Sequence, residues 1–162
     1  MNTIVPNLWF NNCAKEAAEY YVSVFPDGEI LNKDYYTESG EDITGHKMGE
    51  IVTIEFRIMD THFIAINAGP EFVFNPSISF MIPCSNQEEI DYYWGKLSHD
   101  KDAEQCGWAK DKYGLSWQIV PKILEEMLTN GNDKQRKNVT DAFMQMKKFD
   151  IDKLKKAYNK NE

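Results

Sequence analysis

An internal repeat is the feature of this sequence that most constrains its fold. Residues 15–21 match residues 87–93 at an offset of 72 positions, where a glutamate, a second acidic residue and two tyrosines coincide. Near the end of each half, residues 67–70 fall on residues 118–121 at an offset of 51, so the second half is the shorter one. The piece that it lacks corresponds to the region of residues 26–50. This repeat predicts two similar modules within one domain.

The same order of elements recurs in both halves. Apolar residues at steps of three and four predict helices over residues 14–25 and 85–97, and runs of alternating polarity predict strands around them. The predicted strands cover residues 3–10, 29–36, 50–59 and 63–67 in the first half, and 78–83, 105–110 and 115–120 in the second. From Pro121 onward the pattern is helical. The fold class is therefore predicted as α+β.

Composition and charge exclude several classes of partner. The 18 basic and 26 acidic residues give a formal net charge of -8, which disfavours nucleic acid or an anionic membrane surface as a partner. No apolar stretch approaches the roughly 18 residues of a membrane helix, and the N-terminus does not resemble a signal peptide. Cys13, Cys84 and Cys106 lie far apart, so a disulfide framework or a thiolate zinc site is not indicated. These features favour a cytoplasmic protein without membrane or nucleic-acid partners.

Several short motifs resemble one known family. They are Leu8-Trp9-Phe10, Glu16-Ala17-Ala18-Glu19-Tyr20-Tyr21 before Phe25-Pro26, Ile66-Asn67-Ala68-Gly69-Pro70, Cys106-Gly107-Trp108, and Asp111-x-Tyr113-Gly114-x-Ser116-Trp117-Gln118-Ile119-Val120-Pro121. With the repeat, they are similar to the PhnB-like branch of the vicinal-oxygen-chelate (glyoxalase/bleomycin-resistance/dioxygenase) superfamily. Its members are often labelled 3-demethylubiquinone-9 3-methyltransferases. The likeness runs through residues 3–121, and Ala142-x-x-Gln145-Met146-Lys147-Lys148-x-Asp150 resembles the tail of that family.

This resemblance implies a fold of two repeated βαβββ modules that form a cup-shaped mixed sheet with helices outside. Modules 1–70 and 71–121, followed by C-terminal helices over 122–162, would form a single domain over 1–162. In metal-using relatives the four ligands, typically His and Glu, come from the first and last strand of each module.

The positions that match those ligands hold none of the usual ligand types. They are Pro6 or Asn7, Asn67, Ile78 or Ser79, and Gln118. Amide and hydroxyl oxygens are weak, neutral ligands for a divalent ion, so we expect no metal and no cofactor. The three histidines, His46, His62 and His99, lie in predicted loops and turns, where we expect them to be solvated.

Two amide side chains are the candidates for hydrogen bonding to a ligand. The resemblance implies that Asn67 and Gln118 occupy equivalent, inward-facing positions of the two modules. The alternative is that both amides satisfy neighbouring backbone groups. Trp9, Phe80 and Trp108 are candidate flat walls for the ligand, and core packing is the alternative for each.

Strand alternation refines this assignment. If Gln118 points inward, Trp117 points the other way and packs in the core under the helices. Cys106 has the parity of Trp108 and is therefore a further candidate for the ligand-facing side. No His, Lys or Arg neighbours it along the strand to activate it, so a buried, inert thiol is favoured over a nucleophile.

The sequence favours a metal-free protein that binds a small organic ligand in an aromatic cavity and forms a homodimer. One alternative is an enzyme of the same superfamily, whether an isomerase, a lyase, a dioxygenase or the methyltransferase of the family label. A methyltransferase of the doubly wound type needs a Gly-rich loop at a helix N-terminus, and Asn67-Ala68-Gly69-Pro70 does not provide one. Another alternative is an interaction module whose C-terminal helices bind a partner.

Overall fold

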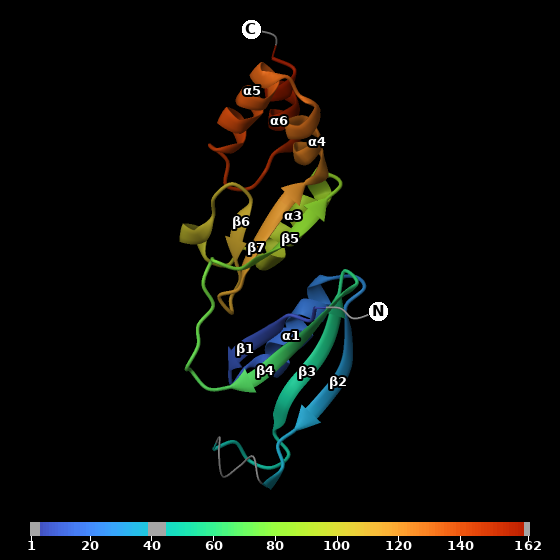
Figure 1. The fold of residues 1–162 in the computed structure, drawn as a ribbon, viewed down its shortest axis with the longest axis vertical. Helices are drawn as coiled ribbons and strands as arrows, with labels where there is room; N and C mark the ends of the chain where they lie inside the picture. Colours follow the sequence, from blue (N-terminus) through green and yellow to red (C-terminus); the bar gives the residue numbers. More distant parts are fainter. Residues whose placement is uncertain (1–3, 39–44, 161–162) are drawn as a thin grey trace. The chain divides into compact units, whose positions relative to one another are not determined.

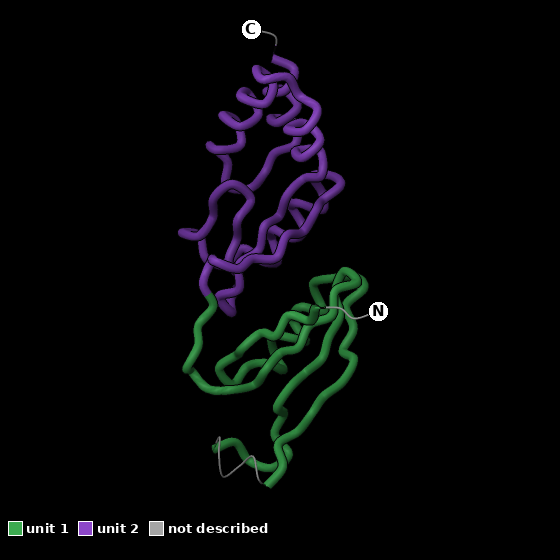
Figure 2. Tube along the Cα trace, in the orientation of Figure 1, with its two compact units in different colours: residues 1–74 green, residues 75–162 purple. Residues whose placement is uncertain are grey.

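The computed structural model of the protein describes residues 4–38 and 45–160. The chain divides into two compact units, residues 1–74 and 75–162 (Figure 2). This boundary lies four residues after the predicted end of the first module, inside the connecting segment. Each unit is described by itself, and a single domain built from both stays a prediction. No helix in the two described ranges is long and apolar enough to cross a membrane.

Unit 1 is a four-stranded mixed sheet with one helix across one of its faces (Figure 1). Its elements are β1 (Asn7–Asn11), α1 (Ala14–Val24), β2 (Glu29–Tyr35), β3 (Ile51–Ile58) and β4 (Thr61–Ala68). The strand order is β1-β4-β3-β2, in which β1 and β4 are parallel and the other pairs antiparallel. This arrangement is the predicted βαβββ module.

Unit 2 repeats this arrangement with one strand fewer. It contains β5 (Ser79–Cys84), α3 (Gln87–Leu97), the short 3-10 helix η1 (Lys101–Ala103), β6 (Trp108–Lys110) and β7 (Ser116–Pro121). The strand order is β5-β7-β6, with β5 and β7 parallel. The α+β class is confirmed, but the second module is βαββ. In place of a counterpart of β2, the backbone of residues 99, 100 and 105 bonds to β6.

The two helices support the repeat, because two buried positions of α1 recur as buried positions of α3 at the offset of 72, and Ala18 and Ile90 are one such pair. Tyr21 of α1 corresponds to Tyr93 of α3, and both rings lie against their own sheet. In unit 1, Tyr21 stacks on Phe56 with ring centroids 5.9 Å apart, and Phe56 stacks on Phe63 at 5.3 Å. Burying each ring contributes roughly 2–3 kcal/mol through the apolar surface removed from water. These rings form the centre of the unit 1 core.

Asp111 organises the turn between β6 and β7. Its Oδ1 accepts hydrogen bonds from the backbone N–H groups of Tyr113 and Leu115, at 2.9 and 3.0 Å. Its Oδ2 accepts a 2.8 Å bond from Nε1 of Trp117, whose side chain is buried in the core as predicted. Gly114 closes the turn with a φ of +88°, which a glycine adopts without strain. The motif from Asp111 to Trp117 is therefore a structural turn.

The C-terminal residues form α4 (Lys122–Asn130), α5 (Asp133–Phe143) and α6 (Ile151–Tyr158) in unit 2 (Figure 1). Each predicted break is present, and Asp150 caps α6 by accepting a hydrogen bond from Lys153 N. Gln87, at the start of α3, joins this segment to the sheet layer. Its Nε2 donates to Phe149 O at 3.0 Å, and its Oε1 accepts from Ile151 N at 2.9 Å.

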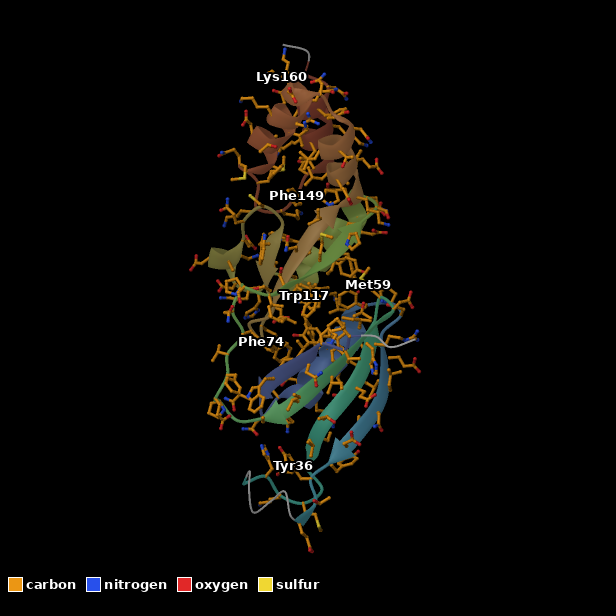
Figure 3. All side chains as sticks on the ribbon, in the orientation of Figure 1. Tyr36, Met59, Phe74, Trp117, Phe149 and Lys160 are labelled. Atoms are coloured by element: carbon orange, nitrogen blue, oxygen red, sulfur yellow. The ribbon has the colours of Figure 1, made fainter. Side chains whose placement is uncertain are left out.

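The hairpin that begins β6 also contacts the C-terminal segment. The backbone N–H groups of Cys106 and Gly107 donate to the carbonyl oxygens of Met146 and Lys147, at 2.8 and 2.7 Å. Gly107 has a φ of +81°, and a Cβ there would lie 2.3 Å from the Phe149 ring. Figure 3 labels this ring. Glycine is therefore required at this position for two independent steric reasons.

Replacing Asp111 by alanine is expected to lower the free energy of unfolding of unit 2 by about 2–4 kcal/mol. Three N–H donors lose their acceptor, and one of them belongs to a buried tryptophan. Urea denaturation followed by tryptophan fluorescence measures the change. Asp141→Ala, on an exposed position of α5, is the matched control and should change the value by less than about 0.5 kcal/mol. Equal effects at the two positions would contradict the role of Asp111.

Replacing Gln87 by alanine is expected to loosen α6 without unfolding the sheet of unit 2. The change removes the side-chain acceptor of Ile151 N and the donor to Phe149 O. Hydrogen exchange measured by mass spectrometry should become faster over residues 149–158 and stay unchanged over β7. Gln105→Ala is the control, because the Gln105 side chain is exposed and, among the described residues, hydrogen-bonds only to the neighbouring Cys106 Sγ, at 3.6 Å.

Candidate functional site

Trp9 lies on the face of the unit 1 sheet that α1 does not cover. Leu8 and Phe10, its neighbours in β1, are buried on the α1 side, so alternation turns Trp9 to the opposite face. Its Nε1 donates a 2.9 Å hydrogen bond to Gly69 O. Its ring meets the Phe72 ring edge to face, with centroids 4.9 Å apart. The indole is therefore fixed in position while remaining only half-buried.

A hollow of about 640 Å³ adjoins this indole, and we call it the Trp9 pocket. It lies within unit 1, where the chain leaves β2 and β4. Tyr36, labelled in Figure 3, directly follows β2, and its hydroxyl donates to Asn67 O at 3.1 Å. The residues that line the pocket are Trp9, Asn12, Tyr36, Gly45, His46, Glu50, Ala68, Gly69, Pro70 and Glu71.

His46 belongs to this pocket, which corrects the prediction that it is solvated. Only 13% of its side chain is exposed, because the imidazole stacks on the Tyr36 ring with centroids 4.7 Å apart. Its Nδ1 lies 3.2 Å from Glu50 Oε2, and the same oxygen accepts a hydrogen bond from Lys47 N. His99 is exposed as predicted, and half-exposed His62 lies 3.2 Å from Glu55 Oε2 on the sheet.

Sequence reasoning missed Tyr36, His46, Glu50 and Glu71 as members of a common site. They come from the segments that follow β2 and β4 and precede β3, where no periodicity marks the direction of a side chain. Pairing of β3 with both β2 and β4 brings these segments together. The available signals were the aromatic Tyr36 at the end of a predicted strand and the histidine four residues before Glu50.

The charge of the Trp9 pocket is negative. Glu50 and Glu71 both line it, and its lining in the described residues contains no lysine or arginine. Glu71 forms no hydrogen bond or ion pair with another described residue. Its carboxylate folds back over Gly69, because a Cβ built on that glycine would lie 2.6 Å from Glu71 Oε2. This carboxylate therefore lies near Gly69, whose carbonyl oxygen accepts the hydrogen bond from Trp9.

Asn67 does not share the face of Trp9, contrary to the prediction that it faces inward. It pairs with Phe10 in the sheet register and so lies on the α1 side. Its Oδ1 accepts a hydrogen bond from Ala14 N at 3.2 Å, and its Nδ2 donates to Ile51 O at 3.1 Å. Both ends of the amide thus bond to backbone, which is the alternative considered above. Asn67 takes the place of a side-chain cap for α1, because Cys13 provides none.

The strand pairing also corrects the sequence offset between the two modules. Phe10 corresponds to Ile82 at the offset of 72, and these residues pair with Asn67 and Ile119 respectively. The offset at this end is therefore 52, and the counterpart of Gln118 is Ile66. An error of one residue moves a side chain to the other face of a sheet. Asn67 and Gln118 are consequently not equivalent.

Gln118 and Trp108 of unit 2 do lie together. They are register partners in the β6–β7 pair and occupy the face that α3 does not cover. Gln118 Nε2 donates to Ser79 Oγ at 2.8 Å, and Met81, on the same face, is 60% exposed. Phe80 lies on the opposite face beside Trp117, with ring centroids 5.9 Å apart.

Cys106 and Cys84 differ in burial. Cys106 lies in the hairpin with a φ of +47°, so the strand parity used to place it does not apply. It is half-exposed instead of buried, and its Sγ lies 4.0 Å from Met144 Sδ. Burial, and next the charge of Glu89, raise the pKa of the Cys84 thiol to about 12, against a smaller effect of Lys122. At neutral pH Cys84 is therefore a protonated core residue.

The residues present do not fit the metal that the resemblance implies for metal-using relatives. The oxygen of Asn67 is engaged with the start of α1, while Gln118 and Ser79 bond to each other. All three are neutral donors, which offset the desolvation of a divalent ion poorly. Residues 4–38 and 45–160 contain no group of three or more His, Cys, Asp or Glu that could hold a metal ion.

A second hollow, of about 670 Å³, lies between α3 and the start of α6 in unit 2. Four of the charged side chains that line it form two ion pairs. Lys148 Nζ lies 2.6 Å from Asp91 Oδ1, and Lys153 Nζ lies 3.5 Å from Asp150 Oδ2. The bond from Lys148, more than the one from Gln87, lowers the pKa of Asp91. The pair of Lys148 and Asp91 links the segment before α6 to α3, whereas the pair of Lys153 and Asp150 lies within the start of α6.

Comparisons with known proteins agree with this architecture. A family model described as 3-demethylubiquinone-9 3-methyltransferase matches residues 2–120. The PhnB protein from Bacillus cereus is 30% identical, with a TM-score of 0.62 over 74% of this chain and 99% of that chain. Protein PA1353 from Pseudomonas aeruginosa is 16% identical, with a TM-score of 0.57 over 75% of this chain and 98% of that chain. A comparison with curated proteins gave no match.

The family match covers both sheets and ends at residue 120, just before α4. The likeness of residues 142–150 to the tail of the family therefore stays a prediction. The fold is of the glyoxalase type. Two sheets, each covered by a helix, and 30% identity with the Bacillus cereus protein support this assignment. The chain belongs to the PhnB-like family that is described as 3-demethylubiquinone-9 3-methyltransferase.

Proposed function

We propose that this protein binds a small organic molecule in the Trp9 pocket, without a metal. The observation that carries the proposal is the fixed indole of Trp9 beside a hollow of about 640 Å³. Pockets for small ligands and cofactors typically measure about 300–1,000 Å³. The hollow thus has a suitable size.

The walls of the pocket are suited to a ligand with apolar or aromatic groups. The hydrogen bond from Trp9 Nε1 and the contact with Phe72 hold the indole before any ligand arrives. Tyr36 and His46 hold each other in the same way by stacking. Side chains that are already ordered lose little conformational entropy on binding, which raises affinity.

Trp108 and Gln118 form a separate candidate surface in unit 2. They lie on the uncovered sheet face next to Ser79 and Met81. An indole, an amide and a thioether can together contact a polar aromatic ligand. A hollow of suitable size adjoins Trp9, so the Trp9 pocket carries the proposal.

An enzyme of the glyoxalase superfamily is the second candidate function, and the pair of His46 and Glu50 favours it. A carboxylate 3.2 Å from Nδ1 orients an imidazole, as a general base requires. The methyltransferase label has less support, because neither sheet is doubly wound and residues 67–70 end in proline without a following helix.

We further propose that the protein is a cytoplasmic homodimer. Three free cysteines are compatible with a reducing compartment. The assembly is independent of the pocket proposal, and sedimentation equilibrium at micromolar concentration determines it. A monomeric mass at that concentration would contradict the dimer.

Nuclear magnetic resonance of the four tryptophan indole N–H groups tests the binding proposal. In a screen of small aromatic and aliphatic fragments, hits should shift the Trp9 signal, which Trp9→Phe assigns by its loss. The Trp117 signal, from a buried core residue of unit 2, should stay in place. Trp9→Leu should weaken binding of a hit about tenfold or more, the effect of losing an aromatic wall.

Trp108→Leu is the matched control, since it removes an indole from the other sheet and should leave binding at the Trp9 pocket unchanged. Hits that shift only the Trp108 signal would move the binding site to unit 2 and overturn the proposal. A screen in which no fragment shifts the Trp9 signal would also overturn it.

A further inference from the structure

We infer that the molecule bound in the Trp9 pocket carries a positively charged amine or ammonium group. This inference rests on the proposed binding function and adds the chemical class of the ligand. It follows from which groups line the hollow and from how their charges are partnered.

The lining of the Trp9 pocket is negatively charged. Two carboxylates, those of Glu50 and Glu71, contribute to it, and no lysine or arginine does so in the described residues. A ligand with a carboxylate or phosphate would therefore be repelled, whereas a cation would be attracted. The charge of -8 on the whole chain acts in the same direction.

The two carboxylates differ in their hydrogen-bonding and ionic partners. Glu50 is held by Lys47 N and by His46, so part of its charge is already satisfied. Glu71 has no hydrogen-bonding or ionic partner in the described part of the chain, yet Gly69 gives its carboxylate room to lie close to the backbone. A side-chain Cβ at position 69 would collide with it at 2.6 Å. The pocket thus contains one uncompensated negative group beside Trp9.

The Trp9 indole forms an aromatic wall of the pocket. The only N–H of the Trp9 side chain is engaged with Gly69 O, so the indole presents its apolar ring to the pocket. An ammonium group within about 6 Å of the face of a tryptophan is attracted by the electrons of the ring. An aromatic face next to an unpaired carboxylate therefore recognises an organic cation better than a neutral or an anionic group.

Three probes with one benzene ring each separate charge from shape. They are benzyltrimethylammonium, benzyl alcohol and phenylacetate. Each is titrated into the 162-residue chain while the nuclear magnetic resonance signal of the Trp9 indole N–H is followed. The ammonium probe should bind at least about tenfold more tightly than benzyl alcohol, and phenylacetate should bind more weakly than both. Raising the salt concentration should weaken only the ammonium probe, because salt screens charge.

Isosteric amide variants identify the carboxylates responsible. Glu71→Gln should reduce affinity for the ammonium probe about fivefold and leave the affinity for benzyl alcohol unchanged. Glu50→Gln should also reduce affinity for the ammonium probe, but by less. The Glu50 carboxylate already accepts a hydrogen bond from Lys47 N and contacts His46. Glu125→Gln, at an exposed position of α4 in unit 2, is the control and should change neither affinity. The melting temperature of each variant confirms that it folds.

Two results overturn the inference. One is equal or tighter binding of benzyl alcohol or phenylacetate at Trp9, which leaves the proposed binding function standing. The other is absence of any Trp9 shift with the ammonium probe. The proposed function itself is decided separately by the fragment screen, so the two failures are distinguishable.

Discussion

Side-chain alternation against a single covering helix decides where the candidate residues of the strands lie in each unit. A strand turns successive side chains to opposite faces, and α1 or α3 buries only one of these faces. Trp9, Trp108 and Gln118 are therefore accessible, whereas Phe80, Trp117 and Asn67 face the helix side. Polar residues on the helix side then serve the backbone, as the bonds of Asn67 to Ala14 and Ile51 illustrate. The Trp9 pocket accordingly lies at the uncovered face of unit 1 and in the loops at its end.

Much of the fold could be predicted from the sequence, because its signals are local and periodic. Apolar spacing located α1 and α3, and the breakers after Phe25 and around Gly131 ended helices where the structure ends them. Trp117 was assigned to the core by parity, and it is buried against Asp111. The missing strand of unit 2 also follows from the shorter repeat. Its replacement by backbone bonds from residues 99–105 could not be predicted, since such bonds involve no particular side chain.

The candidate site was harder to predict, for two physical reasons. An offset error of one residue placed Asn67 as the equivalent of Gln118, although it lies on the other side of its sheet. The remaining members of the Trp9 pocket, including His46 and Glu71, come from irregular segments whose side-chain directions depend on tertiary contacts. Stacking on Tyr36 buries a histidine that its polar sequence neighbours would leave in water. Phe80 was assigned to the wrong face of its strand, since it lies beside Trp117 on the helix side. Cys106 was placed by strand parity, although it lies in a turn.

The carbonyl oxygens of Met146 and Lys147, which accept hydrogen bonds from the hairpin before β6, lie beyond the end of the family match. The part of the chain that matches the family model thus donates hydrogen bonds to residues outside it. A protein ending at residue 120 would leave the amides of Cys106 and Gly107 without these acceptors and would remove the Phe149 ring that covers Gly107. What lies outside the family boundary has become part of the second unit's core. In this chain, the packing of the second unit extends beyond the residues that the family model recognises.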